Sequence, residues 1–97
     1  MNEVSSWKAE KDLLRLSKQG DAAAARRLMS LLIKPAHAMA WRILRSQDAA
    51  EEVVQEAVYQ LWRSAEQFEG QSSLKTYFNK IVMRECHAFI RQIGRAH

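Results

Sequence analysis

The sequence predicts an all-α fold, a compact bundle of about four helices. Glycine (3) and proline (1) are scarce among the 97 residues, and Ala, Leu, Arg, Glu and Gln, which favour helix, are plentiful. Apolar side chains recur at steps of three and four residues, which is the period of an amphipathic helix. An apolar content of 47% suffices for one modest core, so we expect residues 1–97 to form a single domain.

The first two helices are marked by residues that end and begin helices. The first is expected from about residue 7 to residue 18, and Gly20 ends it. Asp21 then predicts the N-cap of a long second helix that ends near Arg45. Pro35 lies inside this helix. We expect Pro35 to kink the helix or to break it in two, because proline lacks a backbone N–H and its ring clashes with the preceding turn.

The third helix is capped by Ser46 or Asp48 and is expected to reach about Gln67. Its apolar side chains fall on one face: Ala50, Val54, Ala57, Val58, Leu61, Trp62, Ala65 and Phe68.

The fourth helix follows a loop at residues 69–73, is capped by Ser72 or Ser73, and reaches about Ile93. Its core face is formed by Leu74, Phe78, Ile81, Val82, Phe89 and Ile93. From the third and fourth helices together, we expect a core that contains Val54, Val58, Leu61, Phe78, Ile81, Val82 and Phe89.

The charges are distributed unevenly along the chain, whose formal net charge is +4. Residues 46–70 carry six acidic and one basic side chain, whereas residues 21–45 and 71–97 each carry five basic and one acidic. A basic chain with one strongly acidic segment indicates two different partners. The alternative is that these are ordinary solvated helix surfaces, which carry charge of some sign without binding any partner. The charge pattern alone leaves both explanations open.

The acidic segment projects from one side of the third helix. At about 100° per residue, these side chains share an arc opposite the apolar face: Asp48, Glu52, Gln55, Glu56, Tyr59, Arg63 and Glu66. Asp48, Glu51 and Glu52 lie in the first turn, where the helix dipole favours negative charge. The dipole accounts poorly for Glu56 and Glu66, which favours a binding surface.

The fourth helix carries a basic ridge opposite its apolar face. The ridge consists of Tyr77, Lys80, Arg84, His87, Arg91 and Arg95, at steps of three or four residues. Guanidinium and ammonium groups neutralise phosphates, and aromatic rings stack on bases, so the ridge suits a nucleic acid. The alternative is a solvated helix face whose last Arg residues complement the C-terminal dipole.

Residues suited to catalysis are few: His37, Cys86, His87 and His97. Cys86 and His87 are adjacent on a helix, so their side chains diverge by about 100° and cannot form a base–nucleophile pair. No Gly-rich phosphate loop, metal-ligand spacing or nucleophile elbow is present in the sequence. We therefore expect no enzyme, no cofactor and no metal site.

The N-terminal segment and the cysteine count indicate a cytoplasmic protein. Residues 1–17 interleave charges with single apolar residues, which excludes a secretory signal. No apolar run approaches the length of a membrane span, so we expect no membrane association. The lone Cys86 cannot form an internal disulfide and fits a reducing compartment.

Three segments carry a resemblance to a known family. Ala50-Glu51-Glu52-Val53-Val54-Gln55-Glu56, followed by Leu61-Trp62-Arg63, resembles a helix in region 2 of extracytoplasmic-function sigma factors, group 4 of the sigma-70 family. Phe68, Gly70, Ser72-Ser73-Leu74, Lys75-Thr76-Tyr77-Phe78 and Ile81 have the spacing of the loop and helix that follow in that family. Upstream, Gly20-Asp21 with Ala25 and Leu28 resembles the family's opening helix pair. The resemblance covers about residues 12–95, and it implies a region 2 domain without the minus-thirty-five-binding region 4, as in a chain truncated at the interdomain linker.

The resemblance implies a transcription initiation factor that binds core RNA polymerase and promoter DNA. The acidic helix would dock on a coiled coil of the largest polymerase subunits through Glu51, Glu52, Gln55 and Glu56. The loop and the fourth helix would bind and help melt the minus-ten element, holding its non-template strand through Phe68, Ser72, Ser73, Lys75, Tyr77, Lys80, Arg84, His87, Arg91 and Arg95. An anti-sigma factor is a further candidate partner.

Phe68, Ser72 and Ser73 are expected to hold an extruded base, because an unstacked base needs an aromatic face and a polar pocket. Phe68 also ends the apolar face of the third helix, so closing the core is its alternative role. Arg84 and Ala88 stand where the family often has Asn and Asp. These departures leave open a second function, a sigma-like module that binds polymerase or a regulator without recognising promoters.

Overall fold

The computed structural model describes the backbone of residues 3–96 and the side chains of residues 7–94, and all regular structure in that part of the chain is helical. Four α-helices and one short 3-10 helix follow in order: α1 (Glu3–Lys18), α2 (Ala22–Leu44), α3 (Gln47–Arg63), η1 (Ala65–Gln67) and α4 (Leu74–Ala96). The predicted all-α bundle of four helices is confirmed. None of the helices within residues 3–96 combines the length and the apolar composition needed to cross a bilayer.

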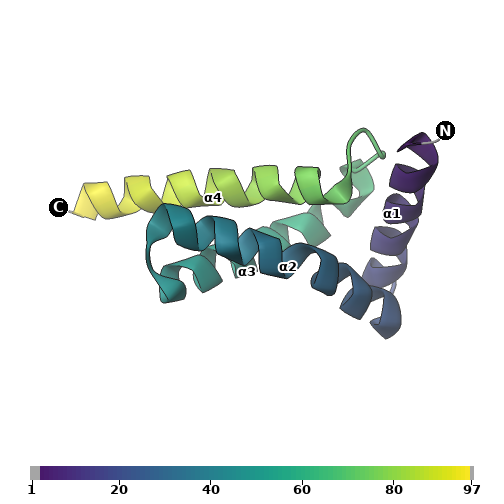
Figure 1. Cartoon of the computed structure of the whole chain (residues 1–97), viewed down its shortest axis with the longest axis horizontal. Coiled ribbons are helices and arrows are strands. Elements are labelled where there is room, and N and C mark those ends of the chain that lie inside the picture. Colours follow the sequence, from purple (N-terminus) through teal and green to yellow (C-terminus); the bar gives the residue numbers. More distant parts are fainter. Residues whose placement is uncertain (1–2, 97) are drawn as a thin grey trace.

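The helices α2, α3 and α4 pack side by side, each against the other two, and α1 crosses them near one end (Figure 1). There α1 contacts α2, η1 and α4. The molecule measures 48 × 27 × 21 Å, and its long dimension follows α4, whose C-terminal end extends beyond the other helices (Figure 1). The segment between η1 and α4 therefore lies at the α1 end of the bundle.

The predicted helix boundaries at residues 20, 21 and 46 are confirmed. Gly20 has a φ of +103°, which glycine adopts without strain, and the N–H of Asp21 bonds the Leu16 carbonyl at 3.1 Å in a helix-ending motif. The Asp21 carboxylate then caps α2 by accepting the N–H of Ala24 at 3.0 Å. The Ser46 hydroxyl caps α3 in the same way, accepting an N–H three residues later at 3.1 Å.

Of the two outcomes expected at Pro35, a kink or a break, the break does not occur, because α2 is continuous from Ala22 to Leu44. The proline N–H is missing, so the carbonyl of Leu31 loses its usual partner within the helix. Leu31 is 53% exposed, and water can reach that carbonyl. The helix therefore accommodates the proline on its solvent-facing flank.

The third helix is shorter than predicted, because α3 ends at Arg63 rather than near Gln67. Both the hydroxyl and the N–H of Ser64 donate to the Gln60 carbonyl, each at 2.9 Å. A serine hydroxyl bonded to the carbonyl four residues earlier competes with the regular helical pattern. The chain then tightens into η1, which leads Phe68 into the core.

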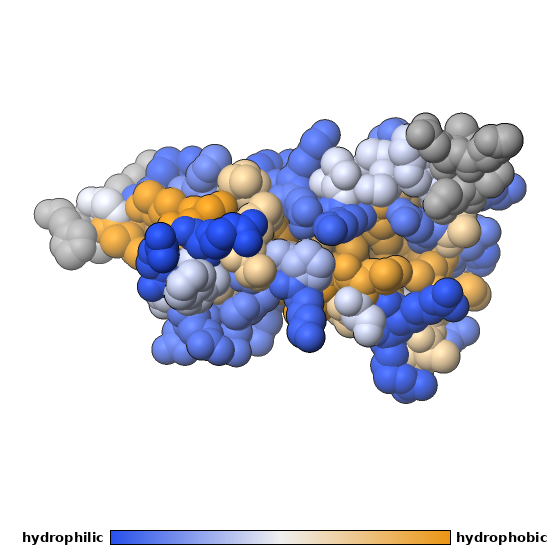
Figure 2. All heavy atoms as spheres, in the orientation of Figure 1, coloured by the Kyte–Doolittle hydropathy of each residue, from blue (hydrophilic) through white to orange (hydrophobic). Residues whose placement is uncertain are grey.

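The core differs from the expectation at its edges. Val54, Leu61, Phe78, Ile81 and Val82 are buried as predicted, together with Leu28, Leu32, Phe68 and Cys86. The predicted core residues Val58 and Phe89 are only half-buried and pack against its margin. Ile93 is 47% exposed, because the end of α4 extends past the bundle. Figure 2 shows the resulting apolar surface on the C-terminal part of α4.

Candidate functional site

The basic ridge lies on the exposed side of α4. Its described basic side chains, Lys80, Arg84, His87 and Arg91, are all exposed. Burial of Phe78, Val82 and Cys86 fixes the rotation of the helix and turns the ridge outward. The side chain of Arg95, the last residue of the predicted ridge, lies outside the described residues.

The ridge borders a groove between the end of α3 and the first half of α4. This basic groove has a volume of about 410 Å³ and is lined by Gln60, Arg63, Ser64, Gln67, Tyr77, Lys80, Ile81 and Arg84. Three of the lining residues are cationic and none is acidic, which suits a phosphate-bearing ligand.

Arg63 is a candidate nucleic-acid contact that the sequence reasoning assigned to the acidic arc of the third helix. In the structure it lines the basic groove with Lys80 and Arg84. Its guanidinium also lies 5.2 Å from the centroid of the Tyr59 ring, a cation–π geometry. One signal was available in the sequence, because Arg63 is the one basic residue of the acidic segment 46–70.

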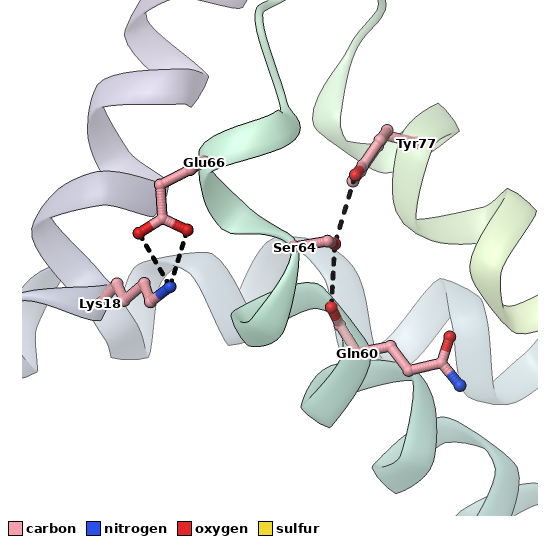
Figure 3. A network of polar contacts seen from close by, with 5 residues as sticks. All are labelled: Lys18, Gln60, Ser64, Glu66 and Tyr77. Atoms are coloured by element: carbon pink, nitrogen blue, oxygen red, sulfur yellow. Dashed lines mark hydrogen bonds and ion pairs between the residues drawn. The ribbon is translucent and has the colours of Figure 1, made fainter.

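A short chain of hydrogen bonds joins α3 to α4 across the basic groove (Figure 3). The Ser64 hydroxyl donates to the Gln60 carbonyl at 2.9 Å, and the Tyr77 hydroxyl lies 3.3 Å from the Ser64 oxygen. Since Ser64 has only one hydroxyl proton, Tyr77 is the donor of the second bond. The Tyr77 side chain is therefore held at the groove wall, where it is half-buried.

The loop serines are engaged locally. The Ser73 hydroxyl caps α4 by accepting the N–H of Thr76 at 3.1 Å, and it donates to the Thr76 hydroxyl at 3.0 Å. The Ser72 hydroxyl donates to the Ser73 carbonyl at 3.1 Å. Of the two caps considered for the fourth helix, Ser73 is thus the one observed. Lys75, in the first turn of α4, is exposed.

Phe68 occupies a different environment from the one its expected role requires. Its side chain is 0% exposed, and its ring centroid lies 5.0 Å from that of Tyr77, with the planes tilted by 55°. A buried ring offers no free face to a base, so in this conformation Phe68 closes the core. Ser72 and Ser73 lie near it in the chain but are only half-buried.

The acidic side of α3 faces a second groove, which continues onto α4. This acidic groove has a volume of about 550 Å³ and is lined by Glu52, Val53, Gln55, Glu56, Glu85, Ala88, Phe89 and Gln92. The structure thus brings three of the four predicted docking residues together. Glu85 was not predicted, although it is the one acidic residue of the segment 71–97.

Gln60 links the two grooves. Its side-chain amide donates to the carboxylates of Glu85 and Glu56, the latter at 3.4 Å, while the residue also lines the basic groove. Glu51, the fourth predicted docking residue, is exposed on the other flank of α3. There it borders a shallower depression with Ile33 and His37 of α2. The acidic surface therefore wraps around the exposed side of α3.

The remaining reactive side chains are isolated. Cys86 is fully buried, and the pKa of its thiol is raised by desolvation and, to a smaller extent, by the nearby charge of Glu85. A buried thiol with a raised pKa is a poor nucleophile. Within the described part of the chain, no three His, Cys, Asp or Glu side chains lie together so as to hold a metal ion, and His97 falls outside that part.

Comparison with known proteins identifies one family. Residues 26–96, about three quarters of the chain, match the family model described as Sigma-70 region 2. The match includes α3, η1, the loop and α4, and with them both grooves and the basic ridge. No curated protein and no solved structure matches the chain significantly.

Proposed function

Because the chain belongs to the Sigma-70 region 2 family, we propose that it docks on core RNA polymerase through α3 and binds the minus-ten promoter element through α4. Region 2 of sigma factors generally binds the polymerase and this element, and sigma factors are not enzymes. The family match over residues 26–96 carries the proposal. The sequence resemblance described above supports the finer assignment to the extracytoplasmic-function group, and a cytoplasmic location follows from the same function.

The polymerase-binding surface that we propose is centred on Glu52, Gln55 and Glu56, with Glu51 on the neighbouring flank. All four side chains are exposed, so a partner can reach them without any rearrangement of the bundle. The half-buried Phe89 at the base of the acidic groove provides an apolar contact within the charged rim. The partner is a coiled coil of the largest polymerase subunits.

The DNA-binding surface that we propose has two parts. Lys75 and the described lysine and arginine side chains of the ridge, Lys80, Arg84 and Arg91, contact phosphates, since they are exposed and cationic. The basic groove, with Tyr77 on its wall and Arg63 at its end, receives the non-template strand of the minus-ten element. Because Phe68 is buried, we assign it a supporting role beneath Tyr77 rather than direct contact with a base.

Binding of core polymerase by the variant Glu56→Lys tests the docking surface. Glu56 is exposed and makes one weak side-chain hydrogen bond, so we expect the free energy of unfolding to change by less than about 0.5 kcal/mol. Charge reversal at the contact should weaken polymerase binding by about 2–5 kcal/mol, measured by titration with labelled chain. Asp12→Lys on α1 is the matched control, since Asp12 pairs with Arg15 of its own helix. Equal polymerase affinity of the Glu56→Lys and Asp12→Lys variants would remove the assignment.

The burial of Phe68 favours the alternative function, a sigma-like module that binds polymerase or a regulator, such as an anti-sigma factor, without recognising promoters. DNA titration at several salt concentrations separates the two functions. A promoter-binding domain loses affinity steeply as salt rises and prefers some single-stranded sequences. A protein-binding module shows neither property, and that result would establish the alternative.

A further inference from the structure

The segment between α3 and α4 is held by polar side chains from α1. Lys18 Nζ lies 2.9 and 3.0 Å from the two carboxylate oxygens of Glu66 (Figure 3). Lys11 Nζ lies 2.8 Å from a carboxylate oxygen of Glu69. Glu66 belongs to η1 and Glu69 to the loop that follows it, so α1 forms ion pairs with this segment at two positions.

A third contact reaches the first residue of α4. The carboxylate of Glu10 accepts a hydrogen bond from the N–H of Leu74, 64 residues away in the chain. The first N–H groups of a helix have no partner within it, and a carboxylate there is favoured by the helix dipole. The local cap, Ser73, satisfies the N–H of Thr76 instead. Glu10 therefore supplies a cap that the loop itself does not provide.

The middle of the loop also lies against α1. Gly70 has a φ of +79°, and a Cβ built on it would lie 3.7 Å from the carbonyl oxygen of Trp7. The backbone of the loop and that of α1 are thus in close proximity. From η1 to the start of α4, α1 contacts the segment at four positions.

These polar contacts are distinct from the ones that anchor α1 in the bundle. Leu14 is 1% exposed and belongs to the core cluster, so α1 is held by apolar burial on its own account. The hydrogen bond from Lys18 lowers the pKa of Glu66, because it favours the charged form of the carboxylate. Each exposed ion pair stabilises the fold only slightly. The polar contacts that Glu10, Lys11 and Lys18 make all involve residues of the segment 65–74.

We propose that α1 is a positioning element for the DNA-binding loop, with Glu10 as its principal positioning residue and Lys11 and Lys18 in support. By fixing η1, the loop and the first turn of α4, these side chains hold the basic groove in the geometry that binds single-stranded DNA. The two lysines also offset the charges of Glu66 and Glu69, which would otherwise repel phosphates. This inference depends on the DNA-binding part of the proposed function.

The full chain carrying Glu10→Ala or Glu10→Gln tests the inference. The probe is a single-stranded DNA oligonucleotide selected for binding to the unmodified chain. Loss of the charge-assisted bond in Glu10→Ala should weaken DNA binding about tenfold and speed amide exchange at Leu74 by a similar factor. Glu10→Gln keeps an acceptor oxygen and should retain most of the affinity. Asp12→Ala is the control and should leave both quantities unchanged, because the Asp12 carboxylate borders the loop but pairs with Arg15 of its own helix rather than with residues 65–74.

A charge exchange provides a second test that does not depend on Glu10. Lys18→Glu should weaken DNA binding by repelling Glu66, and combining it with Glu66→Lys should restore much of the loss. Faster exchange at Leu74 with unchanged DNA affinity would overturn the inference, since Glu10 would then be only a helix cap. Failure of the double variant to recover would also count against it. If the unmodified chain selects no single-stranded DNA, the proposed function itself fails, and the inference falls with it.

Discussion

At the scale of single residues, the tilted pair of Phe68 and Tyr77 connects the core to the DNA-facing surface. Phe68 is fully buried, while Tyr77 is half-buried and lines the basic groove. Their ring centroids are 5.0 Å apart, within the range of favourable aromatic contact. Removing the Phe68 side chain would therefore take away the support of Tyr77 at the wall of the groove, whereas a leucine would keep an apolar contact there.

The variants Phe68→Ala and Phe68→Leu separate packing from base capture. Truncating a fully buried ring should lower the free energy of unfolding by about 3–5 kcal/mol, measured in urea. Phe68→Leu should cost less and leave the preference for single-stranded sequences intact, because the ring contacts no base. Leu28→Ala, a truncation elsewhere in the core, is the matched control for destabilisation. A folded Phe68→Leu variant that loses sequence preference would restore the base-capture role.

Residues of the basic ridge should act through phosphates. Substituting Lys80, Arg84 or Arg91 by Ala should weaken binding similarly for all sequences and flatten the logarithmic salt dependence by about 0.7 on single strands. Lys34→Ala, which removes an exposed cation from α2, is the control and should leave the slope unchanged. A ridge variant that alters the preferred sequence while keeping the salt slope would instead indicate contact with bases.

At the scale of elements, local signals in the sequence predicted the helices, and long-range contacts explain what was missed. Gly20, Asp21 and Ser46 act within a few residues of themselves, so their effects could be predicted. The cap that Glu10 provides for α4 joins residues that are 64 apart in the chain, and no local sequence pattern predicts it. Cys86 continues the four-residue spacing of Phe78 and Val82, so its burial also could be predicted from the helical period.

The candidate site was predicted to a similar extent. Exposure of the acidic residues and of the ridge followed from helical period, because both lie opposite apolar faces. Two participants of the grooves, Arg63 and Glu85, depend on how α3 and α4 face each other. The burial of Phe68 depends on the early end of α3 at Arg63, which redirects the chain into the core.

The continuity of α2 through Pro35 leads to a prediction for this helix. Pro35→Ala supplies the missing N–H, which can bond the Leu31 carbonyl, and it removes the steric clash of the ring. We expect the free energy of unfolding to rise by up to about 3 kcal/mol, measured in urea. DNA and polymerase affinities should not change, since Pro35 lines neither groove. A loss of stability would mean that the half-buried proline ring is needed for packing.

At the scale of the whole molecule, the acidic groove and the basic surfaces lie on one small domain of 48 × 27 × 21 Å. The Debye length is about 8 Å at physiological ionic strength and about 30 Å at 0.01 M salt. At low salt the carboxylates of α3 therefore act across the width of the molecule on any DNA bound to α4. At physiological salt the carboxylate of Glu52, which lies eight residues along α3, or about 12 Å, from Gln60 at the basic groove, is screened from DNA bound there.

Charge reversal at Glu52 should consequently change DNA affinity only at low salt. Glu52→Lys removes one negative charge and adds one positive charge, so DNA binding should tighten at about 0.01 M salt and return to that of the unmodified chain at about 0.15 M. Asp12→Lys makes the same change of charge on α1 and should behave alike, because the effect depends on net charge rather than on contact. Fluorescence anisotropy with a labelled single strand measures both variants across the salt range. If Glu52→Lys alters DNA affinity at about 0.15 M salt while Asp12→Lys does not, the acidic groove contacts DNA directly and the division of the two surfaces between two partners is wrong.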